Sequence, residues 1–407
     1  MPSLKNKRIA LFGGAFDPPH RGHEKALSAF MEETEADLVY VIPSGTPPHK
    51  KLSRGAEDEH RLAMSRLSFG KISDKVFVSD MEIRSPEVSY TLLTVQRLKE
   101  MHPQSEIFLF VGTDQFLAFE TWKEPQALLN LCTLCVMDRF SDRSAVLAQK
   151  AALEEKFSAR CLLLDEKAYI MSSTEIRRDL KENGYSYRLS PEVLSYVSEK
   201  GLYEIRKDEV REQLLLRLQK EISPIRLAHV LSVEREAAEL SALLGAENER
   251  DVRLAALYHD LTKEKSVEEQ ILLAKEFGIT FSPEDLSSPA VLHGMTAALL
   301  ARRDGYVSEE ACRAIEHHTM GAEKMSLSEK ILYFADYIEE TRPYPACRLL
   351  RQEFYGSFPE EKSKRPYHLN QCVYRAMEDT VKHLKEKERA IHPQTVQAMN
   401  DLGKEIL

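Results

Sequence analysis

The stretch LFGGAFDPPHRGHEKAL, residues 11–27, joins an apolar run to a helix-like run through a corner of glycines, prolines and histidines. Gly13 and Gly14 carry no side chains, so backbone N–H groups can approach an anion there, and a helix N-terminus adds positive potential. His20 and His23 stand three residues apart across the turn and can point at the same anion. The pattern therefore predicts a strand, a phosphate-binding turn and a helix.

The succession of an apolar run and a helical stretch, seen at this corner, recurs along the first half of the chain. Over about 200 residues, short apolar runs alternate with helical stretches, which is typical of βαβ units. Such alternation predicts an α/β domain with a mostly parallel, Rossmann-like sheet and helices on both faces. Ligands of such sheets bind at the carboxyl ends of the strands, where Gly13 and Gly14 lie. The expected strands cover residues 8–14, 36–43, 75–80, 106–112, 131–138 and 159–165.

From Ser223 onward the strand pattern gives way to helices. Residues 223–245 begin with Ser-Pro and end at a glycine, which matches the start and stop signals of a helix. Further helices are expected at 248–260, 287–303, 308–319 and 326–340. We therefore predict an α/β domain at residues 1–205, a linker at 206–222 and an all-α domain at 223–407.

Composition narrows the class of protein. A length of 407 residues favours two or three domains, and a formal net charge of −9 argues against a nucleic-acid-binding coat. No run of about 18 apolar residues appears, so we expect no membrane span. The N-terminus lacks the long apolar region of a signal peptide, so we expect a cytoplasmic protein. The sequence does not determine the oligomeric state and is compatible with a monomer or a homo-oligomer.

The six cysteines give no reason to expect disulfides in an intracellular chain. Cys132 and Cys135 resemble a redox or metal-binding pair. They lie in a strand-like run, however, where residues three apart point to opposite faces. We therefore expect both in the core.

Several motifs of the first half occur in one order along the chain. GGAFDPPHRGH (13–23) resembles the (H/T)xGH nucleotidyltransferases, which transfer an adenylyl group from ATP. The motifs that follow it make the first half similar to the bacterial nicotinate-mononucleotide adenylyltransferases. They are IPSGTPPHK (42–50), SPEVSYTLLTV (85–95), FLFVGTDQFLAFETWKEPQALL (108–129) and MSSTEIRRDL (171–180). This resemblance implies adenylyl transfer from ATP, carried with Mg²⁺, to nicotinate mononucleotide.

The resemblance also implies roles for residues of this chain. Groups that bear or stabilise charge at the ATP phosphates would be His20, His23, Lys50 and Arg177. Contacts to the two nucleotides would come from Gly13, Gly14, Phe16, Thr91, Gly112, Asp114, Trp122, Ser172, Ser173 and Thr174. Within this set, Asp114 would hold a ribose hydroxyl, while Thr91 and Trp122 would bind the pyridine mononucleotide. Each of these residues alone also fits a purely structural role. The assignment of binding and catalytic roles therefore depends on the occurrence of all the motifs together, in the order found in the family.

The second half carries six metal-ligating residue types within or at the ends of apolar helical segments. They are His229, His259, Asp260, His293, His318 and Asp336. Histidine and aspartate on apolar faces are costly unless they are paired or bind a metal. Imidazole nitrogens and carboxylate oxygens suit Fe, Mn or Zn, and six donors exceed one tetrahedral site. A pair of ions could activate a bridging water for phosphoryl displacement.

The order H…HD…H…H…D resembles the HD phosphohydrolase superfamily. The motifs HDLTK (259–263), HHTMG (317–321), ADYIEETR (335–342) and IHPQT (391–395) are similar to bacterial HD-type diadenosine tetraphosphate hydrolases. The similarity runs from about Pro224 to the C-terminus. It implies that the six residues hold two divalent transition metals, with iron expected and manganese or zinc as alternatives. Asp260 and Lys263 would be catalytic, and Thr319 and Arg342 would face the substrate phosphates.

The expected reaction of the second half is symmetric hydrolysis of diadenosine tetraphosphate to two ADP. Two alternatives stay open: a nucleotide-sensing module without hydrolysis, and hydrolysis of another nucleotide such as an alarmone or a cyclic nucleotide. His318 is preferred over His317 as a ligand because it directly precedes Thr-x-Gly. We expect His317 at the surface or behind the ligands.

Overall fold

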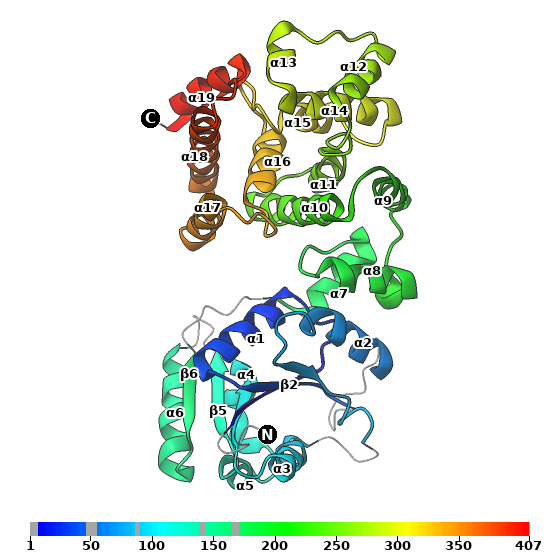
Figure 1. Cartoon of the computed structure of the whole chain (residues 1–407). Coiled ribbons are helices and arrows are strands. Elements are labelled where there is room, and N and C mark those ends of the chain that lie inside the picture. The colour runs from blue at the N-terminus through cyan, green and yellow to red at the C-terminus, as the bar shows by residue number, and fades with distance from the viewer. Residues whose placement is uncertain (1–6, 46–54, 86–89, 138–142, 165–170, 407) are drawn as a thin grey trace. The chain divides into compact units, whose positions relative to one another are not determined.

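The computed structural model describes residues 7–45, 55–85, 90–137, 143–164 and 171–406, which form two compact units (Figure 1). The first unit comprises Met1–Lys207 and the second Asp208–Leu407. Each unit has its own hydrophobic core and is described by itself. Lys50 lies outside the described residues.

A parallel sheet of six strands forms the centre of the first unit, in the order β3-β2-β1-β4-β5-β6. The strands are β1 (Arg8–Gly14), β2 (Leu38–Pro43), β3 (Val76–Val78), β4 (Glu106–Val111), β5 (Thr133–Met137) and β6 (Cys161–Leu164). The order reverses between β1 and β4, which leaves a crevice at the carboxyl ends of these two strands. The predicted Rossmann-like α/β fold is therefore confirmed.

Helices cover both faces of this sheet. They are α1 (Arg21–Thr34), α2 (Asp58–Phe69), α3 (Thr91–Met101), α4 (Thr113–Leu117), η1 (Phe119–Thr121), α5 (Pro125–Leu129), α6 (Arg143–Phe157), α7 (Ser173–Asn183), α8 (Pro191–Lys200) and η3 (Leu202–Glu204). Phe30 of α1 and Phe69 of α2 pack with Phe12 on one face of the sheet. Helices α3 and α6 pack with Leu11 on the other face. Both faces are buried, as a parallel sheet requires.

The cysteine pair follows the alternation of its strand. Cys135 lies in the core on the side of α1, and Cys132 lies in the core on the side of α3. Burial raises the pKa of both thiols, so neither is a reactive thiolate. As expected, the two residues are core residues on opposite faces.

The described residues of the second unit form helices only, which confirms the predicted all-α fold. They are α9 (Glu209–Glu221), α10 (Pro224–Leu244), α11 (Glu249–Tyr258), α12 (Val267–Glu276), α13 (Pro283–Ser287), η4 (Pro289–Val291), α14 (Leu292–Asp304), α15 (Glu309–His317), α16 (Leu327–Ile338), α17 (Pro345–Gly356), η5 (Lys362–Lys364), α18 (Arg365–Glu386) and α19 (Pro393–Ile406). One apolar core joins side chains from most of them. Across the described ranges, no helix has both the length and the apolar character needed to cross a membrane.

Local sequence sets the ends of α10, the longest helix that carries a predicted ligand. The Ser223 hydroxyl accepts a hydrogen bond from the Arg226 N–H at 3.3 Å, and Pro224 occupies the first helical position. Gly245 ends the helix with φ of 72°, in the left-handed region that favours glycine. The predicted start and stop of this helix are confirmed.

The segment 206–222, expected to link the domains, contains helix α9. The Asp208 carboxylate accepts a hydrogen bond from the Arg211 N–H at 3.3 Å and so caps this helix. Leu214 and Leu218, one turn apart, are buried in the core of the second unit. The segment therefore packs as part of the second unit, because this narrow apolar stripe outweighs its charged composition.

Buried polar contacts hold the loop that follows β1. The Asp17 carboxylate accepts hydrogen bonds from the Ala56 N–H at 2.9 Å and from the Tyr203 hydroxyl at 2.8 Å. The buried guanidinium of Arg61 donates to the Ala15 carbonyl at 2.6 Å. Buried charges need such partners, so these contacts fix the backbone of residues 15–17.

Replacing Tyr203 with phenylalanine should lower the free energy of unfolding of the first unit by about 1.5–3 kcal/mol, because Asp17 loses a hydrogen bond to a charged group. The measurement is urea unfolding of the full chain followed by tryptophan fluorescence, since Trp122 is the only tryptophan and lies in this unit.

The matched control is Tyr196→Phe, whose hydroxyl contacts His60 Nδ1 at 2.9 Å and no carboxylate. Its loss should be about 1 kcal/mol or less. Equal losses in the two variants would contradict a special role for the Asp17 contact.

Candidate functional site

The glycines predicted to contact a nucleotide lie at the crevice of the sheet. Gly13 and Gly14 end β1, and Gly112 directly follows β4, the neighbouring strand. A Cβ on Gly14 would come within 2.9 Å of the Phe16 ring, so a side chain cannot be added there without moving that ring. Phe16 itself has φ of 48° and stacks against Phe12. The turn is therefore tight and its backbone is open to the crevice.

His20 and His23 form a reciprocal pair at the start of α1. His20 caps the helix: its Nδ1 accepts from the His23 N–H, and the His23 Nδ1 accepts from the His20 N–H, each at 3.3 Å. The two rings stack with their centroids 3.6 Å apart. The structure thus brings the two predicted histidines together at a helix N-terminus, a position that favours anions.

These contacts determine where the imidazole protons lie. Burial lowers the pKa of His20 to about 4 and holds the pKa of His23 well below its ordinary value. Both rings are therefore neutral at pH 7. Because each Nδ1 accepts a hydrogen bond, the single proton of each ring is on Nε2. The pair therefore offers two neutral Nε2–H donors.

The start of α7 is attached to the loop that precedes His20. The Ser172 hydroxyl caps the helix by accepting from the Thr174 N–H, and the Ser173 hydroxyl donates to the carbonyl of residue 18 at 3.1 Å. The Arg177 guanidinium donates to the carbonyl of residue 17 at 2.6 Å. Four predicted residues from the far end of the unit thus lie beside the histidine corner.

Thr91 and Trp122 lie on two segments that contact each other through neighbouring residues. Thr91 begins α3 and Trp122 follows η1. The Lys123 ammonium lies 4.3 Å from the centre of the Tyr90 ring, which ties their two segments together. Asp114 is exposed at the start of α4, next to Gly112. Among the described residues, no hydrogen bond or ion pair connects Thr91 or Trp122 to the histidine pair.

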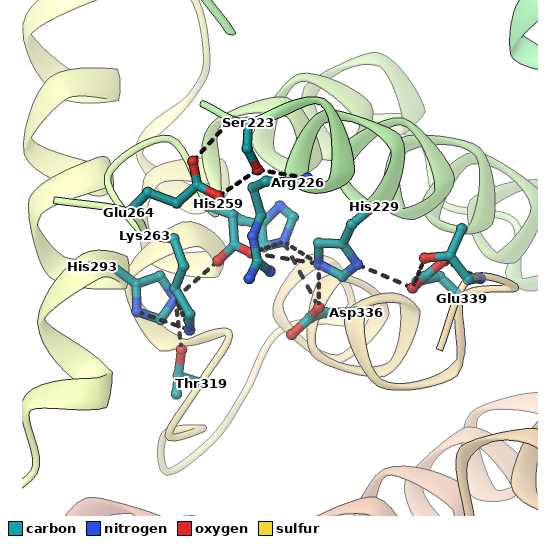
Figure 2. A network of polar contacts seen from close by, with 12 residues as sticks. Ser223, Arg226, His229, His259, Lys263, Glu264, His293, Thr319, Asp336 and Glu339 are labelled. Carbon is teal, nitrogen blue, oxygen red and sulfur yellow. Dashed lines mark hydrogen bonds and ion pairs between the residues drawn. The ribbon is translucent and has the colours of Figure 1, made fainter. Parts of the chain in front are cut away.

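Four imidazoles and two carboxylates come together in the second unit, and Figure 2 shows the contacts around them. They are His229 on α10, His259 and Asp260 at the end of α11, His293 on α14, His318 at the end of α15 and Asp336 on α16. All except Asp336 are buried. The structure therefore gathers all six predicted ligands in one cluster.

Asp260 lies between two pairs of histidines. Its Oδ2 is 3.5 Å from Nε2 of His229 and 3.6 Å from Nε2 of His259. Its Oδ1 is 3.1 Å from Nε2 of His293 and 3.8 Å from Nε2 of His318. A carboxylate that turns one oxygen to each pair is arranged to bridge two cations.

The spacing of the donor atoms fits metal ions. The Nε2 atoms of His229 and His259 are 3.4 Å apart, and those of His293 and His318 are 3.0 Å apart. Ligands that share an ion through bonds of about 2.0–2.2 Å lie about 3.0–3.5 Å from one another. Asp336 adds a carboxylate oxygen 3.1 Å from His229 Nε2. The donor set therefore suits a pair of divalent transition-metal ions.

The other nitrogen of three of these rings is already engaged. The Nδ1 atoms of His259 and His318 lie 2.6 and 2.7 Å from backbone carbonyls three residues earlier, so each must carry the proton. His229 Nδ1 lies 3.0 Å from the Glu339 carboxylate. Such contacts orient a ligand ring and direct the lone pair of Nε2 toward a metal.

Charges in the cluster are balanced within the protein. Burial lowers the pKa of His259, His293 and His318, so these rings are neutral. Burial also opposes protonation of His229, yet hydrogen bonds to Asp260, Asp336 and Glu339 raise its pKa to about 10. A cation bound at this ring would displace its proton.

Three cationic side chains surround the cluster. Arg226 donates to Asp260 at 2.7 Å, Arg342 contacts Asp336, and the Lys263 ammonium lies 3.1 Å from His293 Nε2. The Thr319 hydroxyl lies 3.2 Å from His318 Nε2. Cations and a hydroxyl beside a metal pair can contact the oxygens of a bound phosphate.

His317 points away from this cluster. Its Nδ1 lies 2.6 Å from the carboxylate of Glu329, a residue of the capping box that begins α16. His317 therefore joins two helices, while its neighbour His318 faces the other predicted ligands.

Several residues at the two sites lie outside the set expected from sequence. They are Asp17, Arg61 and Tyr203 around the histidine corner, and Arg226 and Glu339 around the metal-ligand cluster. Glu339 could have been found, because it stands only three residues after Asp336, directly after the last residue of α16. Arg61 and Tyr203 have no such signal, since their partners are far away in the sequence.

Comparisons with known proteins match each half of the chain. Residues 11–179 match the cytidylyltransferase-like family, and residues 226–341 match the HD domain. A structure described as a predicted HD superfamily hydrolase involved in NAD metabolism, from Clostridium acetobutylicum, is 29% identical with a TM-score of 0.43. The match covers 48% of this chain and 97% of that one.

Full-length relatives are similar to about half of the chain. A protein of Synechococcus sp. named "Probable nicotinate-nucleotide adenylyltransferase" is 32% identical, over 50% of this chain and 97% of its own length. A protein of the same name from Desulfitobacterium hafniense is 36% identical, over 49% of this chain and 97% of its own length. Through about half of its length the chain therefore belongs to the nicotinate-nucleotide adenylyltransferase family, and it carries an HD domain in addition.

Proposed function

We propose that the first unit transfers the adenylyl group of ATP to nicotinate mononucleotide, forming nicotinate adenine dinucleotide and pyrophosphate. The observation that supports this most is the pair of neutral Nε2–H donors at the start of α1, beside the crevice of the sheet. The relatives named above carry this activity in their names. Mg²⁺ would accompany the triphosphate.

The reaction needs no protein nucleophile. A phosphate oxygen of the mononucleotide attacks the α-phosphorus of ATP in line, and the bond to the bridging oxygen of pyrophosphate breaks. His20 and His23 donate Nε2–H bonds to phosphoryl oxygens whose negative charge grows in the transition state. Arg177 and the start of α7 lie beside this corner and supply further positive potential.

The remaining predicted residues have binding roles in this proposal. Gly13, Gly14 and Gly112 let the nucleotide approach the backbone, and Phe16 supports the turn. Asp114 holds a ribose hydroxyl, and Thr91 and Trp122 form the pyridine pocket, where the indole is a flat apolar surface.

The substitution His20→Asn should lower kcat for adenylyl transfer about 100-fold or more, because the Nε2–H donor is lost. Asparagine is a good helix cap, so the free energy of unfolding should change by less than about 1 kcal/mol. The measurements are pyrophosphate release and urea unfolding.

His20→Ala serves as the comparison, because it removes the donor and also the cap. It should lose the same activity and, in addition, about 1 kcal/mol of stability. Turnover near the wild-type rate in His20→Asn would overturn the assigned role.

The ring of His20 should stay neutral, with its proton on Nε2, from pH 8 down to about pH 5 in the free protein. Its pKa of about 4 means that the neutral form is lost only as the pH falls through that value. Nitrogen chemical shifts of the labelled imidazole report both charge and tautomer. A ring that titrates near 6.5, or that carries its proton on Nδ1, would contradict the capping geometry.

For the second unit we propose symmetric hydrolysis of diadenosine tetraphosphate to two ADP at a metal pair. The observation that supports it is the position of Asp260 between two histidine pairs. Two ions held there, expected to be iron, would activate a bridging water for attack on phosphorus. Lys263, Thr319, Arg342 and Arg226 are placed to hold the substrate oxygens and to neutralise the charge on the leaving phosphate.

The two alternatives differ from this proposal in their chemistry. A sensor without hydrolysis needs no bridging carboxylate, so the arrangement of Asp260 speaks against it. Hydrolysis of another nucleotide would use the same donors, and a panel of substrates on the purified chain separates these cases.

Two neighbouring histidines give a matched test of the metal site. The wild-type chain, purified without oxygen, should hold about two transition-metal ions, and His318→Ala should lose at least one of them with its hydrolytic activity. His317→Ala should keep both ions, because its ring faces Glu329. Elemental analysis by mass spectrometry gives the count.

Adenylyl transfer should be unchanged in both variants, and also in Asp260→Ala, which should lose hydrolysis. Fewer than one ion in the wild-type chain, together with no hydrolysis, would favour the sensor. Loss of adenylyl transfer in Asp260→Ala would show that the two activities are coupled.

A further inference from the structure

A cavity of about 330 Å³ opens beside the metal-ligand cluster of the second unit. On one side it is lined by His318, Thr319, Asp336 and Arg342, which belong to the site described above. On the other side it extends between α16, the start of α17 and α18. A ligand whose phosphates meet the cluster therefore has room for one further group in this direction.

The far wall of the cavity is largely aromatic. Tyr333 and Tyr337 come from α16, Tyr344 precedes α17, and Cys347 lies within α17. Tyr344 is 58% exposed, so much of its side chain is accessible to a ligand in the cavity. Burial raises the pKa of the Cys347 thiol, which is therefore uncharged. Such a wall suits a flat, uncharged ring.

Three hydroxyl groups of this wall are already engaged with the protein. His383 also lines the cavity but is exposed, so water can bond to its ring whichever base is present. The Thr380 hydroxyl donates to the Ala376 carbonyl at 2.8 Å, and the Tyr337 hydroxyl donates to Asp379 at 3.2 Å. The Tyr333 phenol is hydrogen-bonded to Thr380. These groups have their donors in use, so they are poorly placed to read the edge of a base.

We propose that this cavity is the nucleobase site of the HD unit, and that it holds the base by stacking on Tyr344 with little discrimination between adenine and guanine. This proposal rests on the phosphohydrolase function proposed above. A volume of about 330 Å³ is at the lower end for small-molecule sites, so it accepts one nucleoside. The second nucleoside of a dinucleoside polyphosphate then lies outside the cavity.

Selectivity follows from how the base is held. A stacking surface accepts every base, because each has an aromatic face. Rejection by several orders of magnitude requires polar groups that an incorrect ligand leaves unpaired, and the paired groups of this wall do not provide that penalty. The values of kcat/KM for diadenosine and diguanosine tetraphosphate should therefore agree within about tenfold.

The kinetic test compares three substrates on the metal-loaded full chain: diadenosine tetraphosphate, diguanosine tetraphosphate and inorganic tripolyphosphate, which has no base. Tyr344→Ala should lower kcat/KM for both dinucleotides by about 5- to 100-fold and leave tripolyphosphate within about twofold. Tyr344→Phe should retain the wild-type values, because the ring makes the contact. The matched control is Tyr306→Ala, an exposed tyrosine of the same unit outside the cavity.

A second measurement is independent of turnover. Hydrogen–deuterium exchange of the full chain, followed by mass spectrometry of its peptides, reports ligand contact locally. ADP and GDP should slow exchange of peptides that cover residues 344–350 to a similar degree, and inorganic pyrophosphate should not. Tyr344→Ala should abolish this protection.

The outcomes separate this proposal from the function on which it rests. Protection by ADP and GDP without hydrolysis of any substrate would support the base site and contradict the hydrolase. Hydrolysis that Tyr344→Ala leaves unchanged, or a preference above about 100-fold for one base, would overturn the base site and leave the hydrolase standing. Protection that pyrophosphate gives equally well would also overturn it.

Discussion

A buried carboxylate sets the arrangement of the second unit. Asp260 is only 3% exposed, and a charge so far from water is tolerated only where partners surround it. Histidines from four helices and the guanidinium of Arg226 supply these partners, so the helices must meet at this point. Nearby His259, and hydrogen bonds from His229 and His293, hold the pKa of Asp260 well below its usual value although burial opposes this. The need to surround the charge of Asp260 with partners therefore governs both how these helices pack and which donor atoms meet in the cluster.

In both units, the end of the helix at which a histidine lies can determine its tautomer. His20 caps the start of α1, where free N–H groups supply a donor to Nδ1, so the proton stays on Nε2. His259 and His318 lie at helix ends, where free carbonyls accept the Nδ1 proton, so Nε2 has a bare lone pair. At these three positions the end of the helix decides which ring nitrogen has the proton: Nε2 at the start of α1, and Nδ1 at the ends of α11 and α15.

The sequence predicts a structural feature where the cause of that feature lies within one segment of the chain. The strands of the sheet and the caps at Ser223 and Gly245 follow from patterns within single segments. The six metal-ligating residue types were recognised from their order along the chain, and the structure brings them together from five helical segments. The sequence does not predict a feature that depends on a contact between distant segments. The Asp17–Tyr203 bond spans 186 positions, and no local pattern announces it. Charge dominates the composition of residues 206–222, which predicts a connection between domains. The burial of Leu214 and Leu218 in α9 depends on contacts with the other helices of the second unit.

The position of Asp260 has a consequence for how the second site fills. One carboxylate faces both histidine pairs, so an ion bound at the first pair would fix the orientation and charge that a second ion meets. Two such binding events would not be independent, and thermodynamic linkage would require each to change the affinity of the other by the same factor. The fraction of protein molecules that hold one ion would then differ from the fraction expected for independent binding. That difference would measure the coupling free energy that Asp260 transmits between the two ions.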